Sequence, residues 1–391
     1  MHFVLYIFLG VAVVSCFLAS PHSIFEVKQF EDTVSVDGEK EYHYFKSGKL
    51  RPLASLSPIA SRFDFFNYTL DGTKIHPAKF YGPVKCGRDD LDSLNGTSGR
   101  IKLMEIEGAG VNGYGMFVKD GKYYAQVEAC HQQHADEEKK RIDFPDNEIL
   151  MFGHDYSHCY GHWTHETFAR IFAFPRDLVL RCKIVLPMET DFSRHFFGRY
   201  GVKQENIVVA DSETYVYGKK IHYVDTPDCC LSHPYLIQKT REWIFNTHNV
   251  SSKPYRCVIH QRPKSRRLEN ADELLELFKE KFPDCQWEKH NEPSGWDARI
   301  KYWSEIKLFF GFHGGVLTNI AYMKPGTIVI NIHSSICSTC FYWPAVYGGL
   351  RFYEYYDPRV SHFKKRGYVE DPNTMISIVN ESFRDFNGEC E

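Results

Sequence analysis

A short stretch rich in histidine is the first part of the sequence whose side chains could do chemistry. It carries His154, His158, His162 and His165, and Glu166 follows directly. If Gly161 begins a helix, His162 and Glu166 stand four residues apart and share one face of it. A histidine beside a carboxylate suits removal of the proton from a hydroxyl group, so His162 and Glu166 are candidate catalytic residues. Zinc binding by the histidines is the alternative, although they form no His-Glu-x-x-His pattern.

A basic segment, residues 261–267, follows a predicted strand. It contains Arg262, Lys264, Arg266 and Arg267. Guanidinium groups bind a diphosphate through paired hydrogen bonds, and the end of a strand would fix where these groups point. The segment is therefore a candidate diphosphate site, and a solvated basic loop is the alternative.

The third candidate is a turn that contains two glycines, between a predicted strand and a predicted helix. Gly314 and Gly315 would let backbone N–H groups approach an anion closely, and the next helix would present its positive N-terminus. His313 could donate a hydrogen bond to a phosphate, and Thr318 and Asn319 stand in the first turn of the helix. A tight turn with a solvated histidine is the alternative.

Strands and helices alternate from residue 160 onward, which predicts parallel sheets covered by helices. In the first half the pattern predicts helices over residues 161–174 and 192–200, and strands over residues 183–186 and 207–210. In the second half it predicts strands over residues 256–260, 286–287, 308–312 and 327–332, and helices over residues 297–305 and 316–323. A further helix begins after Asn270, which with Glu273 resembles a capping box. Ligands bind beyond the carboxyl ends of strands in such sheets, so loops that follow strands are the places to expect a site.

The N-terminal part of the chain predicts targeting to a membrane. Residues 3–18 are almost entirely apolar, a length that fits either a cleaved signal peptide or a short signal anchor. Residues 21–80 show no sustained period and are predicted to form an irregular stem. Glycosylation sequons begin at Asn67, Asn95, Asn249 and Asn380. Together with the apolar segment they indicate the lumen of the Golgi or endoplasmic reticulum, for a chain that is anchored in the membrane or secreted.

Composition limits the remaining classes of function. The net charge is −3, and no run of five like charges occurs, so a nucleic-acid partner is not expected. The 12 cysteines permit disulfides in an oxidising compartment. Cys337 and Cys340 have the spacing of a redox or zinc pair, but no second pair stands at zinc-site distance, so we interpret them as structural.

Taken together, the three candidate segments resemble glycosyltransferase family 61, which includes plant β-1,2-xylosyltransferases, the EGF-domain O-GlcNAc transferase and the O-mannose β-1,4-GlcNAc transferase. His162 to Glu166 is similar to the family's His-x-x-x-Asp/Glu helix, and the Arg262 to Arg267 run matches its Arg-x-x-Ser-Arg-Arg motif. His313-Gly-Gly-x-Leu-Thr-Asn319 is similar to the family's His-Gly-Ala-Gly-Leu-Thr-Asn, and a Pro-Gly-Thr segment follows it. In this chain one glycine of that motif is moved by one position. The resemblance covers residues 150–335.

The resemblance implies a GT-B fold, in which two Rossmann-like α/β domains face a cleft, and an inverting transfer of a sugar from a UDP-sugar to a glycan or glycoprotein. Xylose and N-acetylglucosamine are the sugars it favours. The expected divisions are a targeting segment (1–20), a stem (21–80), an acceptor domain (81–248) and a nucleotide-sugar domain (249–391). The donor would be bound by Arg262, Ser265, Arg266, Arg267, His313, Gly314, Gly315, Thr318 and Asn319. No cofactor or divalent metal is expected, because the only Asp-x-Asp, residues 90–92, lies outside the matched segments. A catalytically inactive glycan-binding relative and, less favoured, a zinc hydrolase are the alternatives.

Overall fold

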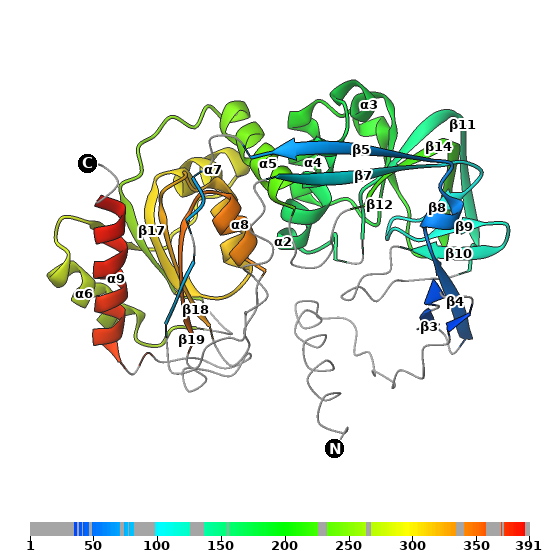
Figure 1. Cartoon of the computed structure of the whole chain (residues 1–391). Coiled ribbons are helices and arrows are strands. Elements are labelled where there is room, and N and C mark those ends of the chain that lie inside the picture. The colour runs from blue at the N-terminus through cyan, green and yellow to red at the C-terminus, as the bar shows by residue number, and fades with distance from the viewer. Residues whose placement is uncertain are drawn as a thin grey trace, which may run out of the picture.

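The computed structural model describes residues 35–36, 39–40, 42–46, 49–70, 74–76, 78–81, 98–125, 137–154, 156–225, 233–262, 267–333, 340–356, 369 and 371–387. The targeting segment predicted at residues 1–20 lies outside these residues. Within the described part, no helix is both long and apolar enough to cross a bilayer. The described chain is mixed α/β, and its two large sheets form two lobes that lie side by side (Figure 1).

The C-terminal lobe is built on a six-stranded sheet in which every pair of neighbouring strands is parallel. Its strands, in spatial order, are β16 (Gln286–Lys289), β15 (Arg256–His260), β17 (Ile306–Phe312), β18 (Ile328–His333), β19 (Arg351–Tyr356) and β6 (Lys79–Tyr81). The first five alternate with helices along the chain, as the sequence pattern predicted. The order of these five along the sheet is 2-1-3-4-5, which places a topological switch point between β15 and β17.

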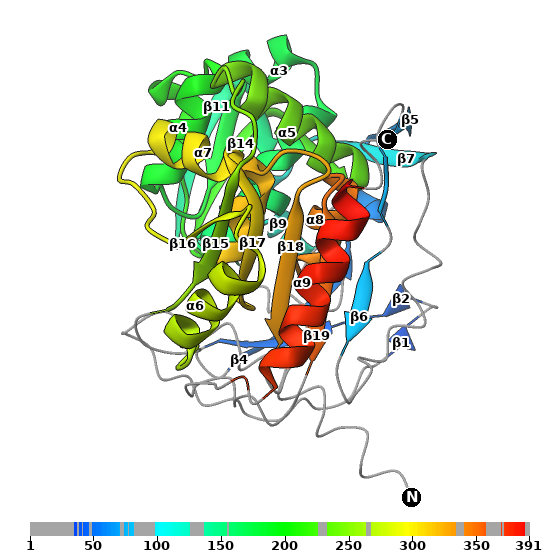
Figure 2. The same cartoon turned by 90° about the vertical axis from the view of Figure 1, so that its left-hand side faces the viewer.

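Helices cover both faces of this sheet. On one face lie α6 (Ala271–Lys281) and α9 (Pro372–Asn387), as Figure 2 shows. On the other face lie α7 (Trp296–Ser304), the 3₁₀ helix η7 (Gly315–Tyr322) and α8 (Tyr342–Tyr347). Successive strand residues point to opposite faces, so Leu308 and Phe310 pack into the core under α6 and α9, whereas Phe309 packs into the core that the two lobes share.

The N-terminal lobe contains an eleven-stranded sheet with a parallel centre. The central strands are β13 (Ile207–Val209), β12 (Lys183–Leu186), β11 (Lys140–Met151) and β14 (Thr214–Asp225). Beyond β14 lie mostly antiparallel strands, namely β3 (Tyr42–Lys46), β4 (Lys49–Ser55), β5 (Arg62–Thr69), β7 (Ser98–Ile106), β8 (Gly110–Val111), β9 (Phe117–Lys119) and β10 (Lys122–Ala125). A separate pair is formed by β1 (Ser35–Val36) and β2 (Glu39–Lys40), and η2 (Ser57–Ile59) is a short 3₁₀ turn.

The helix predicted over residues 161–174 is helical throughout but irregular in its backbone. It consists of α2 (Tyr160–His162), one π-helical turn η4 (Trp163–Thr167) and the 3₁₀ helix η5 (Phe168–Ala173). Trp163 and Phe168 stack with ring centroids 5.1 Å apart, and both contact Phe196. The other helices of this region are α3 (Arg176–Arg181), α4 (Asp191–Tyr200), η6 (Gln204–Asn206) and α5 (Pro234–Thr247).

Two details of the sequence prediction are wrong. Residues 21–80 are not an irregular stem throughout, because β4 and β5 pair with β10 and β7 and β6 completes the parallel sheet of the other lobe. Such partners are far away along the chain, so a local window cannot reveal them. Asn270 does stand at the N-cap of α6, but its side chain makes no capping bond. It bonds instead to the backbone of Val369, at 2.9 and 3.1 Å.

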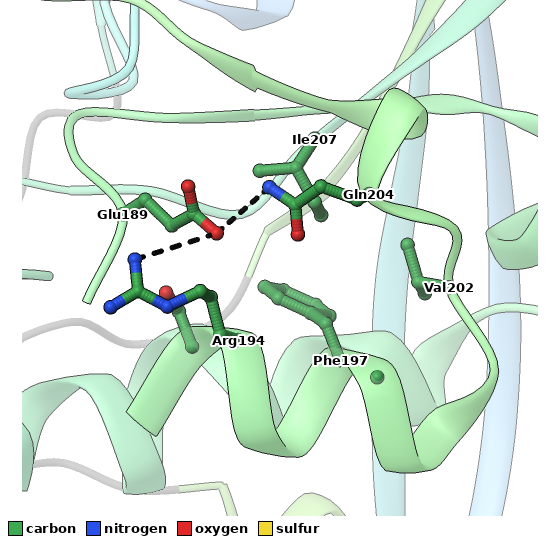
Figure 3. A pocket seen from close by; sticks show the side chains of 8 residues that line it. Glu189, Arg194, Phe197, Val202, Gln204 and Ile207 are labelled. Atoms are coloured by element: carbon green, nitrogen blue, oxygen red, sulfur yellow. Dashed lines mark hydrogen bonds and ion pairs between the residues drawn. The ribbon is translucent and has the colours of Figure 1, made fainter. Parts of the chain in front are cut away.

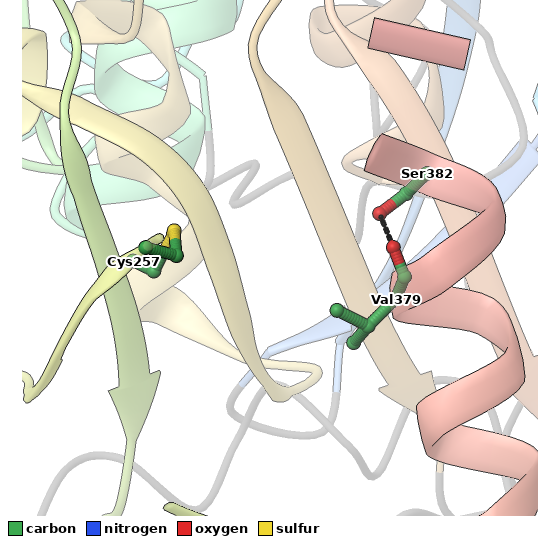
Figure 4. The surroundings of a disulfide bond; sticks show 4 residues. Cys257, Val379 and Ser382 are labelled. Carbon is green, nitrogen blue, oxygen red and sulfur yellow. Dashed lines mark hydrogen bonds between the residues drawn. A yellow bond between two sulfur atoms is a disulfide. The ribbon is translucent and has the colours of Figure 1, made fainter. Parts of the chain in front are cut away.

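A disulfide joins Cys257 on β15 to Cys285, the residue before β16. Cys257 belongs to the same core as Val379 of α9, which lies farther along the sheet (Figure 4). Cys340 is also disulfide-bonded. The structural interpretation of Cys337 and Cys340 stays a prediction, because Cys337 lies outside the described residues.

Candidate active site

His162 and Glu166 form a buried pair directly after the parallel strand β11. His162 Nδ1 lies 3.0 and 2.9 Å from the two carboxylate oxygens of Glu166. The π-helical turn keeps the two side chains on one face, as the spacing predicted. The Glu166 side chain is 5% exposed and that of His162 is 13% exposed. The carboxylate therefore lies behind the imidazole, which is the member of the pair closer to solvent.

Two further aromatic rings surround His162. The Tyr156 ring stacks on it at 5.0 Å, and the His154 ring meets it at 6.0 Å. His154 Nε2 also lies 3.4 Å from a Glu166 oxygen. This enclosure restricts the orientation of the His162 ring.

His165 belongs to the same segment but bonds to the other lobe. It is buried, and desolvation lowers its pKa to about 4, so it is neutral at pH 7. It shares a hydrogen bond with the backbone of Thr318 on η7. His165 therefore connects the His162 segment to the C-terminal lobe.

The switch point of the parallel sheet brings two of the predicted segments to the same edge. The basic segment follows the carboxyl end of β15, and the His313 turn follows the carboxyl end of the adjacent strand β17. Crevices at such switch points are where open α/β sheets bind their ligands. The sequence placed both segments after strands, but only the strand order makes them neighbours.

Arg262 and Arg267 carry buried nitrogens at this edge. Arg262 Nη1 and Arg267 Nε have no hydrogen-bond partner within the described protein. Burial lowers the pKa of Arg262, although an arginine this basic keeps its charge. A buried cationic nitrogen without an acceptor is costly, so these two atoms indicate a place for an anion. Ser265 and Arg266 lie outside the described residues.

His313 is held by residues of the neighbouring strands. Asn331 Nδ2 lies 3.3 Å from His313 Nδ1 and 3.2 Å from Glu354 Oε1. The His333 ring stacks on that of His313 at 4.7 Å, and His333 Nε2 lies 2.8 Å from Glu354 Oε1. Asn331 Nδ2 also lies 2.9 Å from His333 Nε2, so these contacts hold the His313 ring in place, and the orientation of the Asn331 amide decides which ring nitrogen carries the proton.

The two lobes meet where α2 packs against η7. Thr318 is fully buried there, and a side chain on Gly161 would come within 2.9 Å of Thr318 Oγ1. Asn319 accepts a hydrogen bond from Tyr160 at 2.9 Å and donates to Glu292 at 3.1 Å. Thr318 and Asn319, which the sequence assigned to the donor, thus pack between the lobes in the structure.

Sequence reasoning missed Arg241, which fixes η7 in place. This buried side chain donates to the backbone oxygens of Ile320 and Ala321, at 2.8 and 3.1 Å, and to that of Met323. A signal was present, because Arg241 stands on the buried face of α5 together with Ile237, Thr240 and Ile244. A charge among apolar positions with this spacing indicates a buried partner.

Groups that could hold a metal lie outside the histidine-rich segment. Among the residues that the structure describes, they are Glu148 with Cys182 and His222, and His195 with His248 and Asp297. The histidines at 154, 158, 162 and 165 belong to neither group.

A small pocket beside α4 also lies outside the predicted residues. Glu189 and Gln204 bond across it at 2.8 Å, and Arg194 lies 3.8 Å from the same carboxylate (Figure 3). Phe197 and Ile207 supply its apolar wall.

The predicted glycosylation sites differ in what the structure describes of them. Asn249 and Asn380 are exposed, the former in the left-handed region at φ 49° after α5 and the latter on α9. Asn67 belongs to β5, and Asn95 lies outside the described residues. Glycosylation at all four remains a prediction.

Comparison with known proteins gives one family. The family model described as Glycosyltransferase 61 matches residues 160–330. The match begins at α2, includes the basic segment and the His313 turn, and ends within β18. A search of curated proteins gave no match.

Proposed function

The chain belongs to glycosyltransferase family 61, and from this premise we propose that it transfers a sugar from a UDP-sugar to a glycan or glycoprotein with inversion at the anomeric carbon. Xylose and N-acetylglucosamine are the donor sugars that we propose first. We place the enzyme in the lumen of the secretory pathway. The observation that carries the donor site is the pair of unpartnered nitrogens on Arg262 and Arg267 at the switch point of the parallel sheet.

We assign the leaving diphosphate to the edge formed by β15 and β17. Arg262 and Arg267 would pair with its oxygens, with Ser265 and Arg266 on the same segment. His313 would donate a hydrogen bond, and Gly314 and Gly315 would let the backbone approach. Thr318 and Asn319 would hold this loop in position through their contacts with the other lobe. Fixed donors of this kind stabilise the charge that develops on the leaving group, so the proposed mechanism needs no metal.

His162 is the proposed general base. Glu166 accepts the Nδ1 proton of the neutral imidazole, which leaves Nε2 to accept the proton of the acceptor hydroxyl. The hydroxyl oxygen then forms a bond to the anomeric carbon while the bond from that carbon to the diphosphate oxygen breaks. Glu166 is thus a positioning residue, and the arrangement resembles the carboxylate and histidine of a catalytic triad. The GT-B arrangement is part of this proposal, and the two lobes with their shared core support it.

Nucleotide release by the purified full chain tests the proposal. UDP-xylose and UDP-N-acetylglucosamine are each supplied with a mixed glycoprotein acceptor, with and without EDTA. We expect release of UDP that depends on the acceptor and persists in EDTA. UDP binding without turnover on any donor or acceptor would favour the inactive glycan-binding relative. Activity abolished by EDTA while UDP binding and the thermal midpoint are unchanged would contradict the metal-free mechanism.

A further inference from the structure

Three side chains from three helices gather at the junction of the lobes, apart from the proposed active site. They are His195 on α4, His248 at the C-cap of α5 and Asp297 on α7. One potential ligand atom of each lies within 4.8 Å of those of the other two. These helices lie next to one another in both views of the molecule (Figures 1 and 2). We name these residues the junction cluster.

Both histidines of the junction cluster have a buried nitrogen without a partner. The His248 side chain is 3% exposed, and its Nδ1 lies 2.7 Å from Asp297 Oδ1. Its Nε2 and that of His195 are buried and make no hydrogen bond within the described protein. The two rings stack with centroids 5.6 Å apart. Buried nitrogens of this kind call for an explanation, and two in one cluster indicate a missing ligand.

Asp297 is oriented by a neighbouring cation. Arg199 Nη2 lies 2.6 Å from Asp297 Oδ2, while Oδ1 faces His248. Arg199 thus fixes the orientation of the carboxylate, and an ion would bind by replacing the hydrogen bond between Oδ1 and His248 Nδ1. The Asp297 side chain is 61% exposed, so an ion can enter from solvent and keep a water ligand.

We propose that the junction cluster binds a divalent transition metal, with zinc the preferred ion, and that this ion fastens α4 of one lobe to α7 of the other. Two imidazoles and one carboxylate are a ligand set that zinc accepts, and a water completes four-coordination. The role is structural and separate from sugar transfer, because the junction cluster shares no residue with the proposed donor and base sites.

The second group of potential ligands fits a metal less well. Glu148 is paired with Arg181 at 3.0 Å and with His222 at 3.2 Å, much as Asp297 is paired with Arg199 and His248, so the carboxylates do not distinguish the two groups. Burial raises the pKa of the Cys182 thiol to about 12, which keeps it protonated. A thiol must lose its proton to bind zinc, so the junction cluster is the better candidate.

Metal titration of the full chain, without a histidine tag, tests the proposal. Protein treated with EDTA and dialysed is titrated with Zn²⁺ by calorimetry and with Co²⁺ by visible absorption, and its thermal midpoint is followed. We expect one ion per chain, a Co²⁺ spectrum of a four-coordinate site and a rise in the midpoint with Zn²⁺. H195A and D297N should each weaken Zn²⁺ binding by about 10-fold or more, as loss of a ligand does.

D191N is the matched control for D297N. Asp191 begins α4, is 86% exposed and pairs with Arg194, but it lies outside the junction cluster. Its substitution should leave Zn²⁺ affinity unchanged. If H195A fails to fold, D297N still decides the question. The proposal is refuted if wild-type protein binds no ion, or if D297N and H195A both bind Zn²⁺ as tightly as wild type, because the ion would then sit elsewhere. Binding of UDP after EDTA treatment, measured in parallel, separates this outcome from failure of the proposed donor site.

Discussion

Replacing Glu166 by glutamine is the sharpest test of the proposed base. The wild-type carboxylate contacts His162 Nδ1 through both oxygens, at 3.0 and 2.9 Å, and is 5% exposed. A glutamine of the same shape would offer an N–H to Nδ1, which favours the tautomer that carries its proton on Nε2. That tautomer cannot accept a proton from the acceptor hydroxyl. General-base catalysis contributes about 10²- to 10⁴-fold, or about 3 to 5 kcal/mol of barrier at about 1.4 kcal/mol for each factor of ten, so E166Q should lower kcat by that factor.

The assay follows UDP release under saturating donor and acceptor and measures UDP affinity separately by calorimetry. UDP affinity should not change, because Glu166 lies outside the proposed donor site. H162Q should lower kcat by a similar factor, and the double variant should lose little more than either single one, since the two residues act as a unit. H158Q is the control, because His158 belongs to the same segment but its side chain is exposed. A kcat for E166Q within threefold of wild type would refute the assignment of the base.

Four further substitutions test three separate parts of the structure. R267A and R262A should each weaken UDP binding by about 10- to 100-fold, since a hydrogen bond to a charged group contributes about 1.5–3 kcal/mol. R194A is the control, because Arg194 is a cation of the opposite lobe. Unchanged calorimetric affinity for UDP in both R267A and R262A would contradict the donor site. R241M should lower the thermal midpoint, because the backbone carbonyls of η7 would lose a buried hydrogen-bond donor. UDP binding per folded molecule should not change. An unchanged midpoint in a thermal scan would contradict this role of Arg241. H165Q should make the stability of the protein less sensitive to acid. The pKa of His165 is about 4 in the folded chain and 6.5 ordinarily, so between these pH values only the unfolded chain takes up the proton. The wild-type protein therefore loses stability as the pH drops from 6.5 towards 4. Between pH 7 and pH 5 this contribution is about 2 kcal/mol at about 1.4 kcal/mol per pH unit, and urea unfolding at both pH values should show a smaller difference in H165Q than in wild type.

The sequence by itself determined the regular part of the C-terminal lobe. Apolar β-branched runs and helical spacing are local signals, and they placed β15, β17, β18 and α7 to within two residues at each end. The pairing of His162 with Glu166 was also predictable, because four residues make one turn of any helix close to the α form. Here the turn is π-helical, yet the two side chains still meet.

Only the tertiary structure decided which segments share a site. The strand order makes β15 and β17 neighbours, so the basic segment and the His313 turn reach one edge although some 50 residues separate them. The pairing of β4, β5 and β6 with distant strands was equally out of reach, because the hydrogen bonds that order these segments come from partners far along the chain.

Burial decided which partners the polar side chains of these segments take. The sequence showed Thr318 and Asn319 as polar residues at the start of a helix, but packing of α2 on η7 encloses them between the lobes. Asn270 stands where a helix cap was expected, yet its amide bonds to Val369, about 100 residues away. A buried polar side chain needs a hydrogen-bond partner from the protein, because water is excluded. Which partner it finds depends on which surfaces come together in the folded chain.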